Sequence, residues 1–357
     1  MLEVIKLDTF AERDNYSALV SLLNINNPYC LLDYIIVFGG GLEGLMYFKY
    51  VTNEKKIIIM PGYLRKVIIG SNISSHFHFS SPYGYTGPFF SNAIKENEIK
   101  AFWQHVDDWY KGNNVVSEFI RFNLFNNHLN YTGSVFSTMK NVKGKIIDIE
   151  EQWKSFDQKV RKNVNKAIRE NLRYKIFYYN IEDKHIEEFY AIYHHTMIRT
   201  NAQKSFMYSF RNIHSFISNN PRYCAICTTY DQNIAISSEL VLISDDSIFS
   251  FLGGTNKLYF AKRPNDFLKF QIINWARNIK KQYYILGGGF GCEDGIFQYK
   301  KSFFPNDIVE YFTGRKIMDK QLYNKFLQLR NSERVNEGKN ILSNDDTSYF
   351  PLYNKVD

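Results

Sequence analysis

Three strand candidates follow one another between residues 223 and 255, and this group is the strongest constraint on the fold. They read YCAICTTYD, QNIAISSELVLIS and SIFSFLGGT. Each is rich in β-branched or aromatic residues, and turn-forming residues separate them. The second half of the chain must therefore contain a sheet that is built around these three strands.

Helices and further strands surround this group in a definite order. An amphipathic helix at 150–172, a strand at 174–179 and helices at 183–200 and 207–220 precede it. A helix at 263–280 follows, with Pro264 in its first turn. Next come a strand that ends in glycines (QYYILGGG), a short helix (DGIFQYKKSFF) and a last strand (DIVEYFTG). From residue 174 on, the predicted order is β-α-α-β-β-β-α-β-α-β.

The first half of the chain shows a looser version of this order. Strands are expected at VIKLDT, DYIIVFGG, LEGLMYFKYV, KKIIIMPG, HFHFSS, VVSEFIRFNLF and GKIIDI, with helices at NYSALVSLL and 97–113. We therefore expect an α+β fold of two tandem lobes, each a mixed β-sheet flanked by helices. The expected bounds are 1–149 for the first lobe and 150–315 for the second. Residues 316–335 should form a helix that packs back, and 336–357 a loose polar tail.

Length and composition agree with two domains. The 357 residues are long for a single core, and 45% of them are hydrophobic. The formal net charge of +8 favours polyanionic partners such as nucleotides, phosphorylated lipids or RNA, and we expect no DNA partner. No apolar signal-peptide core and no run of about 18 apolar residues occurs. A cytoplasmic location is expected, and a peripheral membrane contact is compatible with the sequence.

The cysteines and histidines do not predict a metal site. Cys224 and Cys227 form a C-x-x-C pair inside a strand, where residues three apart point to opposite faces. His76 and His78 alternate on another strand without a third ligand. We interpret the cysteines as small buried hydrophobic residues of a reducing compartment.

The helix at 150–172 has one apolar and one basic face. A solvated basic face is one interpretation, and a surface that faces a polyanion is the other. Arg161 lies nearest the apolar edge, so it is the residue best placed to turn inward and bind a phosphate or carboxylate.

The segment SSPYGYTGPFF at 80–90 must be a shaped loop, because its prolines and glycines cannot continue a helix or a central strand. It presents Tyr83 and Tyr85. A loop that serves packing alone is one interpretation. The alternative is a substrate-binding wall whose tyrosines stack on a sugar or form hydrogen bonds with it.

The glycine run LGGGFG, which begins at Leu286, is not a dinucleotide fingerprint, because no early βαβ unit with a following acidic residue supports it. It is not a P-loop either, because no G-K-[ST] follows. The run ends a strand and precedes a short helix, where backbone N–H groups near Gly288 and Gly289 can bind an oxyanion or phosphate.

Lys300 lies on that short helix, three or four residues from Ile296, Phe297, Phe303 and Phe304. A lysine among apolar side chains either extends its ammonium group to solvent or meets a negative charge. The functional interpretation is a partly desolvated cation that faces the charge developing in acyl transfer. Glu239, inside ISSELVLI, is a carboxylate in an apolar run, and both a general base and a salt bridge fit that pattern.

Three segments resemble the Fem-type peptidyltransferases and their GNAT acetyltransferase relatives. SFDQKVRKNVNKAIRENLRYKIF resembles the K-x-R-x-x-x-x-K-A helix that opens their second lobe, and GGGFGCEDGIFQYKKSFFP resembles their closing F-K-x-x-F motif. SSPYGYTGPFF is similar to a loop of relatives encoded among surface-polysaccharide genes. Lys300 matches the motif lysine, with Tyr299 in place of its Phe. Phe303 matches the second aromatic residue, and Arg161 the arginine of the helix.

The resemblance covers roughly residues 30–315 and implies a tandem-GNAT transferase. Such an enzyme would move an acyl group, with acyl-CoA as the expected donor, onto an amine or hydroxyl of a cell-envelope or polysaccharide precursor. The acceptor would be a small-molecule or lipid-linked sugar or peptide. This chain has TNKLYFAKR where an R-x-x-G-x-G/A pyrophosphate loop is expected, and it lacks the long coiled-coil insertion that some Fem enzymes use with tRNA.

The implied mechanism is direct attack of the acceptor on a thioester or aminoacyl ester. Glu239 or Asp294 would help to remove the proton. Lys300 and the N–H groups near Gly288 and Gly289 would stabilise the oxyanion, and Tyr83, Tyr85, Arg161 and Phe303 would bind substrate. Two alternatives stay open. One is an aminoacyl-tRNA-dependent peptidyltransferase of cell-wall precursors. The other is a catalytically inactive GNAT-like binding module with a collapsed cleft.

Overall fold

The computed structural model describes residues 1–91, 93–291 and 293–356 and divides into two units. Unit 1 comprises Met1–Ile25, Tyr29–Thr138 and Tyr311–Asp357, and unit 2 comprises Asn26–Pro28 and Met139–Glu310. The division differs from the one expected after residue 149. It falls inside two strands, β7 (Ser134–Lys145) and β13 (Ile308–Ile317). No linker marks it, which explains why composition and turn signals gave a different position.

Unit 1 contains a mixed sheet in the order β1-β2-β3-β4-β6-β13. Its neighbouring strands are antiparallel except β4 and β6, which run parallel. The bounds of the strands are Leu2–Lys6 (β1), Leu45–Val51 (β2), Ile57–Ile69 (β3), Asn72–Ser80 (β4) and Val115–Arg121 (β6), and the short β5 (Phe89–Phe90) pairs with β3.

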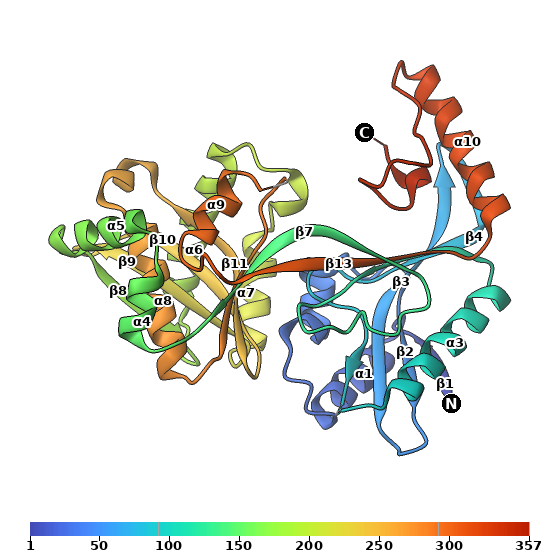
Figure 1. Cartoon of the computed structure of the whole chain (residues 1–357), viewed down its shortest axis with the longest axis horizontal. Coiled ribbons are helices and arrows are strands. Elements are labelled where there is room, and N and C mark those ends of the chain that lie inside the picture. Colours follow the sequence, from blue (N-terminus) through green and yellow to red (C-terminus); the bar gives the residue numbers. More distant parts are fainter. Residues whose placement is uncertain (92, 292, 357) are drawn as a thin grey trace. The chain divides into compact units, whose positions relative to one another are not determined.

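Helices cover both faces of this sheet. Val115 packs in a core with Phe102 and Trp103 of α3 (Glu96–Gly112), whereas its neighbour Val116 packs with α10 (Lys320–Asn336). Because successive strand residues point to opposite faces, α3 and α10 lie on opposite sides of β6 (Figure 1). A third helix, α1 (Phe10–Leu22), begins at a capping box between Thr9 and Glu12.

The prediction of a strand at DYIIVFGG is wrong. Residues Leu32–Tyr34 form the short helix α2, and Ile35–Gly39 continue it as a π-helical turn. Tyr34 and Ile35 are buried, as is Phe38. A short apolar run fits a buried helix as well as a buried strand, so periodicity does not separate the two.

The C-terminal segment after α10 differs from the loose tail expected at 336–357. Tyr353, in the 3₁₀ turn Leu352–Asn354, is fully buried and packs with Tyr323 and Phe326 of α10. Its hydroxyl lies 2.6 Å from the Ser117 hydroxyl on β6. A few apolar residues in a polar segment are enough to dock it.

The strands of unit 2 follow one another in the order β7-β12-β11-β10-β9-β8. The strands are Arg173–Tyr178 (β8), Cys224–Asp231 (β9), Ile234–Ile243 (β10), Ser247–Thr255 (β11) and Tyr283–Gly287 (β12). β11 and β12 are parallel, whereas the other neighbours are antiparallel. From β8 to β13 the elements follow the order predicted from the sequence.

The helices of unit 2 are α4 (Ile149–Ser155), α5 (Gln158–Arg169), α6 (Asp183–Arg199), α7 (Phe210–Asn219), α8 (Pro264–Asn278) and α9 (Gly295–Lys301). The single helix expected at 150–172 is therefore two helices. Phe156 interrupts it with an extended backbone and buries its ring in the core of unit 2.

The two faces of the unit 2 sheet are covered by different helices. Val241 and Ile243 pack in one core with α5 and α8, and the alternate residues Leu240 and Leu242 point to the other face. Helix α6 packs against β10 and β11 (Figure 1). It approaches β11 so closely that a Cβ atom at Gly254 would lie 2.4 Å from the Thr196 hydroxyl.

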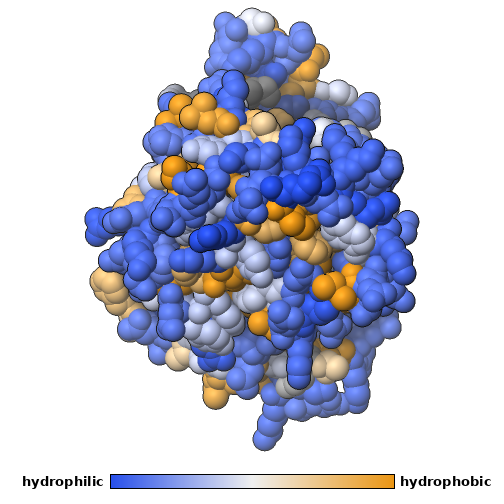
Figure 2. All heavy atoms as spheres, turned by 90° about the vertical axis from the view of Figure 1, so that its left-hand side faces the viewer, coloured by the Kyte–Doolittle hydropathy of each residue, from blue (hydrophilic) through white to orange (hydrophobic). Residues whose placement is uncertain are grey.

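The protein surface seen in Figure 2 is mostly hydrophilic, and its hydrophobic residues form small separate groups. None of the helices in the described ranges is long and apolar enough to cross a membrane.

The docking of the C-terminal segment can be tested at Tyr353. Tyr353→Ala should lower the free energy of unfolding by about 3–5 kcal/mol, because it leaves a cavity among aromatic rings. Tyr353→Phe should cost about 1 kcal/mol through the lost contact with Ser117. Tyr349, 42% exposed in the same segment, is the control, and Tyr349→Ala should change stability by less than about 0.5 kcal/mol. Equal effects at both positions in urea titrations would contradict the docked segment.

Candidate functional site

Strands β11 and β12 separate at the centre of unit 2. Their described pairing covers only Ser247 to Phe249 of β11 against Tyr283 to Ile285 of β12. The residues of β11 up to Phe249 are buried, and those from Ser250 to Thr255 are partly exposed. The edge of β11 beyond Phe249 therefore opens into a cavity.

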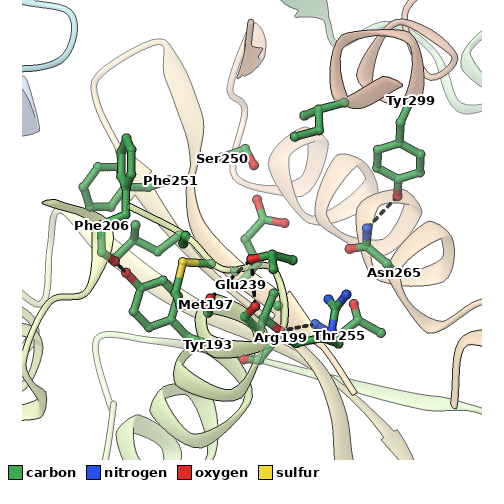
Figure 3. Close-up of a pocket in the computed structure, with 18 of the residues that line it drawn as sticks. Tyr193, Met197, Arg199, Phe206, Glu239, Ser250, Phe251, Thr255, Asn265 and Tyr299 are labelled. Atoms are coloured by element: carbon green, nitrogen blue, oxygen red, sulfur yellow. Dashed lines mark hydrogen bonds between the residues drawn. The ribbon is translucent and has the colours of Figure 1, made fainter. Parts of the chain in front are cut away.

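This cavity has a volume of about 930 Å³ and belongs entirely to unit 2. Its wall comprises the end of α6, the segment 200–206, β10, β11, the start of α8, and α9 with Phe290 before it. Figure 3 shows Glu239 of β10 between α6 on one side and Asn265 and Tyr299 on the other. Asn265 Nδ2 donates a hydrogen bond to the Tyr299 hydroxyl at 2.9 Å, and this contact connects α8 with α9.

A buried polar cluster forms the floor of the cavity. Lys269 Nζ, on α8, donates to Glu239 Oε2 at 2.5 Å, to Ser250 Oγ at 2.8 Å and to the Tyr284 hydroxyl at 3.0 Å. The Tyr284 hydroxyl donates to Glu239 Oε1 at 2.6 Å. Glu239 and Lys269 are only 4% and 5% exposed. The two charges compensate each other, which is the condition for burying either of them.

Both oxygens of Glu239 thus accept hydrogen bonds from protein groups. Burial and the neighbouring carboxylate raise the pKa of Tyr284 well above its usual value, so its hydroxyl remains a donor to Glu239. The salt bridge that the sequence left open is present, and the general-base role of Glu239 stays a prediction.

Lys300 extends from α9 to the same cavity. Its ammonium group donates to the backbone carbonyl of Gly288 at 2.6 Å. Burial, and next the positive charge of Lys269, lower the pKa of Lys300 to about 8. Lys300 therefore differs from Lys269, since no carboxylate among the described residues forms an ion pair with it.

Asp294 is the N-cap of α9. Its carboxylate accepts hydrogen bonds from the N–H groups of Phe297, Phe290 and Gly291 at 2.9, 2.7 and 3.0 Å, and these contacts lower its pKa. The carboxylate also fills the space beside Gly289, where a Cβ atom would lie 2.1 Å from Asp294 Oδ1. Asp294 is not a cavity-lining residue, and the contacts give it a capping role.

The other residues predicted around the glycine run lie outside the cavity wall. Gly288 contributes the carbonyl that binds Lys300, and neither Gly288 nor Gly289 lines the cavity. Phe303 is fully buried and packs against Phe156 and Tyr299. Its contact with Tyr299 supports a residue of the cavity wall, and its role in substrate binding stays a prediction.

Arg161 and the two loop tyrosines do not line this cavity. Arg161 donates through Nη1 to the carbonyls of Lys154 and Phe156, where α4 ends. Tyr83 and Tyr85 belong to unit 1, where Tyr85 packs edge-on against Tyr29 and Tyr311. Tyr83 is 44% exposed. Their part in binding substrate stays a prediction.

The start of α8 brings a carboxylate to the cavity. Asp266 lies in the first turn of α8 and accepts a hydrogen bond from Asn163 Nδ2 at 3.1 Å. Burial raises its pKa. Arg263, just before the helix, has the left-handed conformation with φ 61° and also lines the cavity.

Sequence reasoning missed Lys269, Ser250, Tyr284 and Asp266. The sequence does indicate Lys269, because this lysine lies on the apolar face of its helix. It comes three, four and seven residues before Ile272, Ile273 and Ala276. This is the same argument that selected Lys300. Tyr284 and Ser250 gave no such signal, because tyrosine and serine are common in strands.

Other reactive groups do not form a centre in the described part of the chain. Three or more His, Cys, Asp or Glu side chains nowhere gather there into a candidate metal site. Cys224 and Cys227 are fully buried, and burial raises the pKa of the Cys224 thiol to about 12. A thiol of this kind is a poor nucleophile.

Comparison with known proteins shows a shared fold. No family model and no curated protein matches the sequence. Among solved structures, the crystal structure of FemX matches with a TM-score of 0.63 and 11% identity, over 90% of this chain and 99% of FemX. The C-terminal domain of a putative lysylphosphatidylglycerol synthetase from Agrobacterium fabrum matches with a TM-score of 0.57 and 10% identity, over 92% and 98%. A conserved protein of unknown function from Bacteroides thetaiotaomicron VPI-5482 matches with a TM-score of 0.57 and 10% identity, over 89% of this chain and 100% of that protein's chain.

The expected α+β fold of the Fem type is thereby confirmed, since the chain shares its fold with FemX. Identities near 10% establish the architecture alone, so the chemistry must be argued from the residues of this chain.

The buried Glu239–Lys269 pair can be tested by a double-mutant cycle. Lys269→Met should destabilise unit 2 by about 3–5 kcal/mol, because it leaves a buried carboxylate without its counter-ion. Adding Glu239→Gln should recover part of that loss. The exposed pair Lys140–Glu293 of unit 2, at 2.6 Å, is the control and should contribute less than about 1 kcal/mol. Additive losses at Glu239 and Lys269 in urea titrations would contradict the coupling.

Proposed function

Because the chain has the Fem-type, GNAT-like fold, we propose that it is an acyl or aminoacyl transferase whose reaction takes place in the cavity of unit 2. The observation that carries the proposal is Lys300, a cation at the cavity wall whose charge is not balanced by an ion pair with a described carboxylate. An unbalanced cation in a partly desolvated site is suited to stabilise a developing oxyanion.

The proposed reaction is a direct transfer. The acceptor amine or hydroxyl forms a bond to the donor carbonyl carbon, and the bond from that carbon to the leaving sulfur or oxygen breaks. The carbonyl oxygen carries negative charge in between, and Lys300 binds it. We assign to Glu239 the removal of the acceptor proton, which ends on the leaving group.

The open cavity supports an enzyme over an inactive binding module. A module that had lost catalysis would be expected to have a collapsed cleft between β11 and β12. The cavity beside β11 instead has a volume of about 930 Å³, with charged and hydroxyl groups in its wall.

We propose a cell-envelope or polysaccharide precursor as the acceptor, in small-molecule or lipid-linked form. The support is the resemblance of the 80–90 loop and the names of two matched structures, FemX and a putative lysylphosphatidylglycerol synthetase.

Lys300→Met should lower the transfer rate by about 10²–10³-fold, because the oxyanion loses its cation. Lys301→Met is the matched control, since Lys301 follows on the same helix and does not line the cavity. The wild-type rate should fall as the pH rises above about 8, where Lys300 loses its proton. Near-normal turnover of a folded Lys300→Met variant would remove Lys300 from the mechanism.

A second candidate, aminoacyl transfer from charged tRNA, is favoured by Asp266. In a conventional acyl-CoA site, a helix N-terminus binds the pyrophosphate. Here the first turn of α8 starts with Pro264, which has no N–H, and already holds the Asp266 carboxylate. A second negative group would be repelled there, whereas the ammonium group of an aminoacyl donor would be attracted.

Donor assays decide between the two candidates. With charged tRNA as donor, Asp266→Asn should raise KM by about tenfold through the lost ion pair. With acetyl-CoA as donor, the same variant should react as well as the wild type or better. Asp245→Asn is the control, because Asp245 is exposed and lies outside the cavity wall. Transfer from acetyl-CoA alone would exclude the aminoacyl candidate.

A further inference from the structure

Unit 1 contains a second cavity, of about 690 Å³, which the proposed transfer reaction does not use. Its wall comprises residues 132–136, β13, α10 and the C-terminal segment that follows α10. The docked C-terminal segment thus closes one side of it.

Arg315 of β13 lies in the wall of this cavity. Its guanidinium group lies over the ring of Phe136, 4.5 Å from the ring centre, and 5.8 Å from the ring centre of Phe350. The side chain is only 8% exposed. Nη1 donates to the backbone carbonyl of Thr347 at 2.8 Å, whereas Nε has no hydrogen-bond partner among the described residues.

A buried guanidinium group normally has a carboxylate partner, because an uncompensated charge is costly to desolvate. Among the described residues, no carboxylate forms an ion pair with Arg315, and burial lowers its pKa. Asp346, in the same wall, pairs with Lys355 at 3.0 Å. The neighbouring Lys316 pairs with Asp107 and Glu118.

Further donors surround Arg315. Lys320 and Asn324 of α10 line the cavity, as do Thr132, Ser134 and Asn344. The wall therefore combines a guanidinium group that forms no ion pair with a described carboxylate, a second cation, hydroxyls and amides. It also contains the Asp346 carboxylate, which already pairs with Lys355. Donor groups of these kinds in one wall are complementary to an oxyanion.

We propose that the unit 1 cavity binds a small molecule through a phosphate or carboxylate group, with Arg315 as its main ligand and Lys320 as the second cation. Nε of Arg315 has no hydrogen-bond partner among the described residues, so the ligand would approach the guanidinium group at that edge, where its N–H groups match two oxygens of one anion. The volume exceeds that of the anion alone and leaves room for the molecule that carries it.

Titration calorimetry of the full chain with inorganic phosphate and, separately, with citrate tests the proposal. We expect one of the two to bind at one site in the millimolar range or tighter, and chloride at equal ionic strength not to replace it. The stronger binder identifies the oxyanion class. Arg315→Met should weaken binding by about tenfold or more, and Lys320→Ala should weaken it several-fold.

Two variants keep the result interpretable. Lys325→Ala is the matched control, because Lys325 is exposed on the same helix and does not line the cavity. Arg315→Lys retains the charge, and its affinity for the anion should lie between the affinities of the wild type and of Arg315→Met. This variant tests the proposal if Arg315→Met does not fold. Absence of binding of both anions, or equal binding by wild type, Arg315→Lys and Lys320→Ala, would overturn the proposal. Transfer activity is not a readout here, so the outcome is independent of the proposed function.

Discussion

The ammonium group of Lys269 holds together the part of unit 2 on which the candidate site depends. Its three hydrogen bonds go to Glu239 on β10, Ser250 on β11 and Tyr284 on β12. The described pairing of β11 with β12 ends at Phe249 and Ile285, next to these residues. The charged network therefore connects side chains of three strands at the place where the ladder between β11 and β12 ends.

The side chains of Lys269, Lys300 and Arg315 differ in the groups that lie next to their positive charges. Lys269 is fully compensated by Glu239, which suits a structural role next to the site. Lys300 has only a carbonyl oxygen as its partner, and Arg315 has a carbonyl oxygen and two aromatic rings. An anion gains most from a cation that has no ion-pair partner, and the proposed roles of Lys300 and Arg315 both rest on this difference from Lys269.

Much of the fold could be predicted from the sequence, because the strands of unit 2 are long, apolar and separated by clear turn residues. The order from β8 to β13 follows from that pattern alone. The helix α2 was mistaken for a strand because a short apolar run lacks a period. β7 was expected only at its end, since its exposed first part is polar.

The site was harder to predict, because its residues meet through tertiary contacts. Lys300 and Glu239 could be selected, since each is a charge in an apolar setting. Their partners could not be assigned, because nothing in the sequence shows that α8 brings Lys269 to β10. Asp294 illustrates the opposite case. A carboxylate before a short helix fits a cap as well as a base, and only the three N–H groups around it show the capping contact.

The position of unit 2 within the chain has a consequence for how the protein is made. Unit 1 is discontinuous, since β13, α10 and the C-terminal segment come after all of unit 2. During synthesis on the ribosome, residues 139–310 emerge before unit 1 has its last strand, so unit 2 is the first to be complete. Until β13 has emerged, the edge of β6 that pairs with it is unprotected. During that interval the edge of β6 is open to incorrect pairing with other strands.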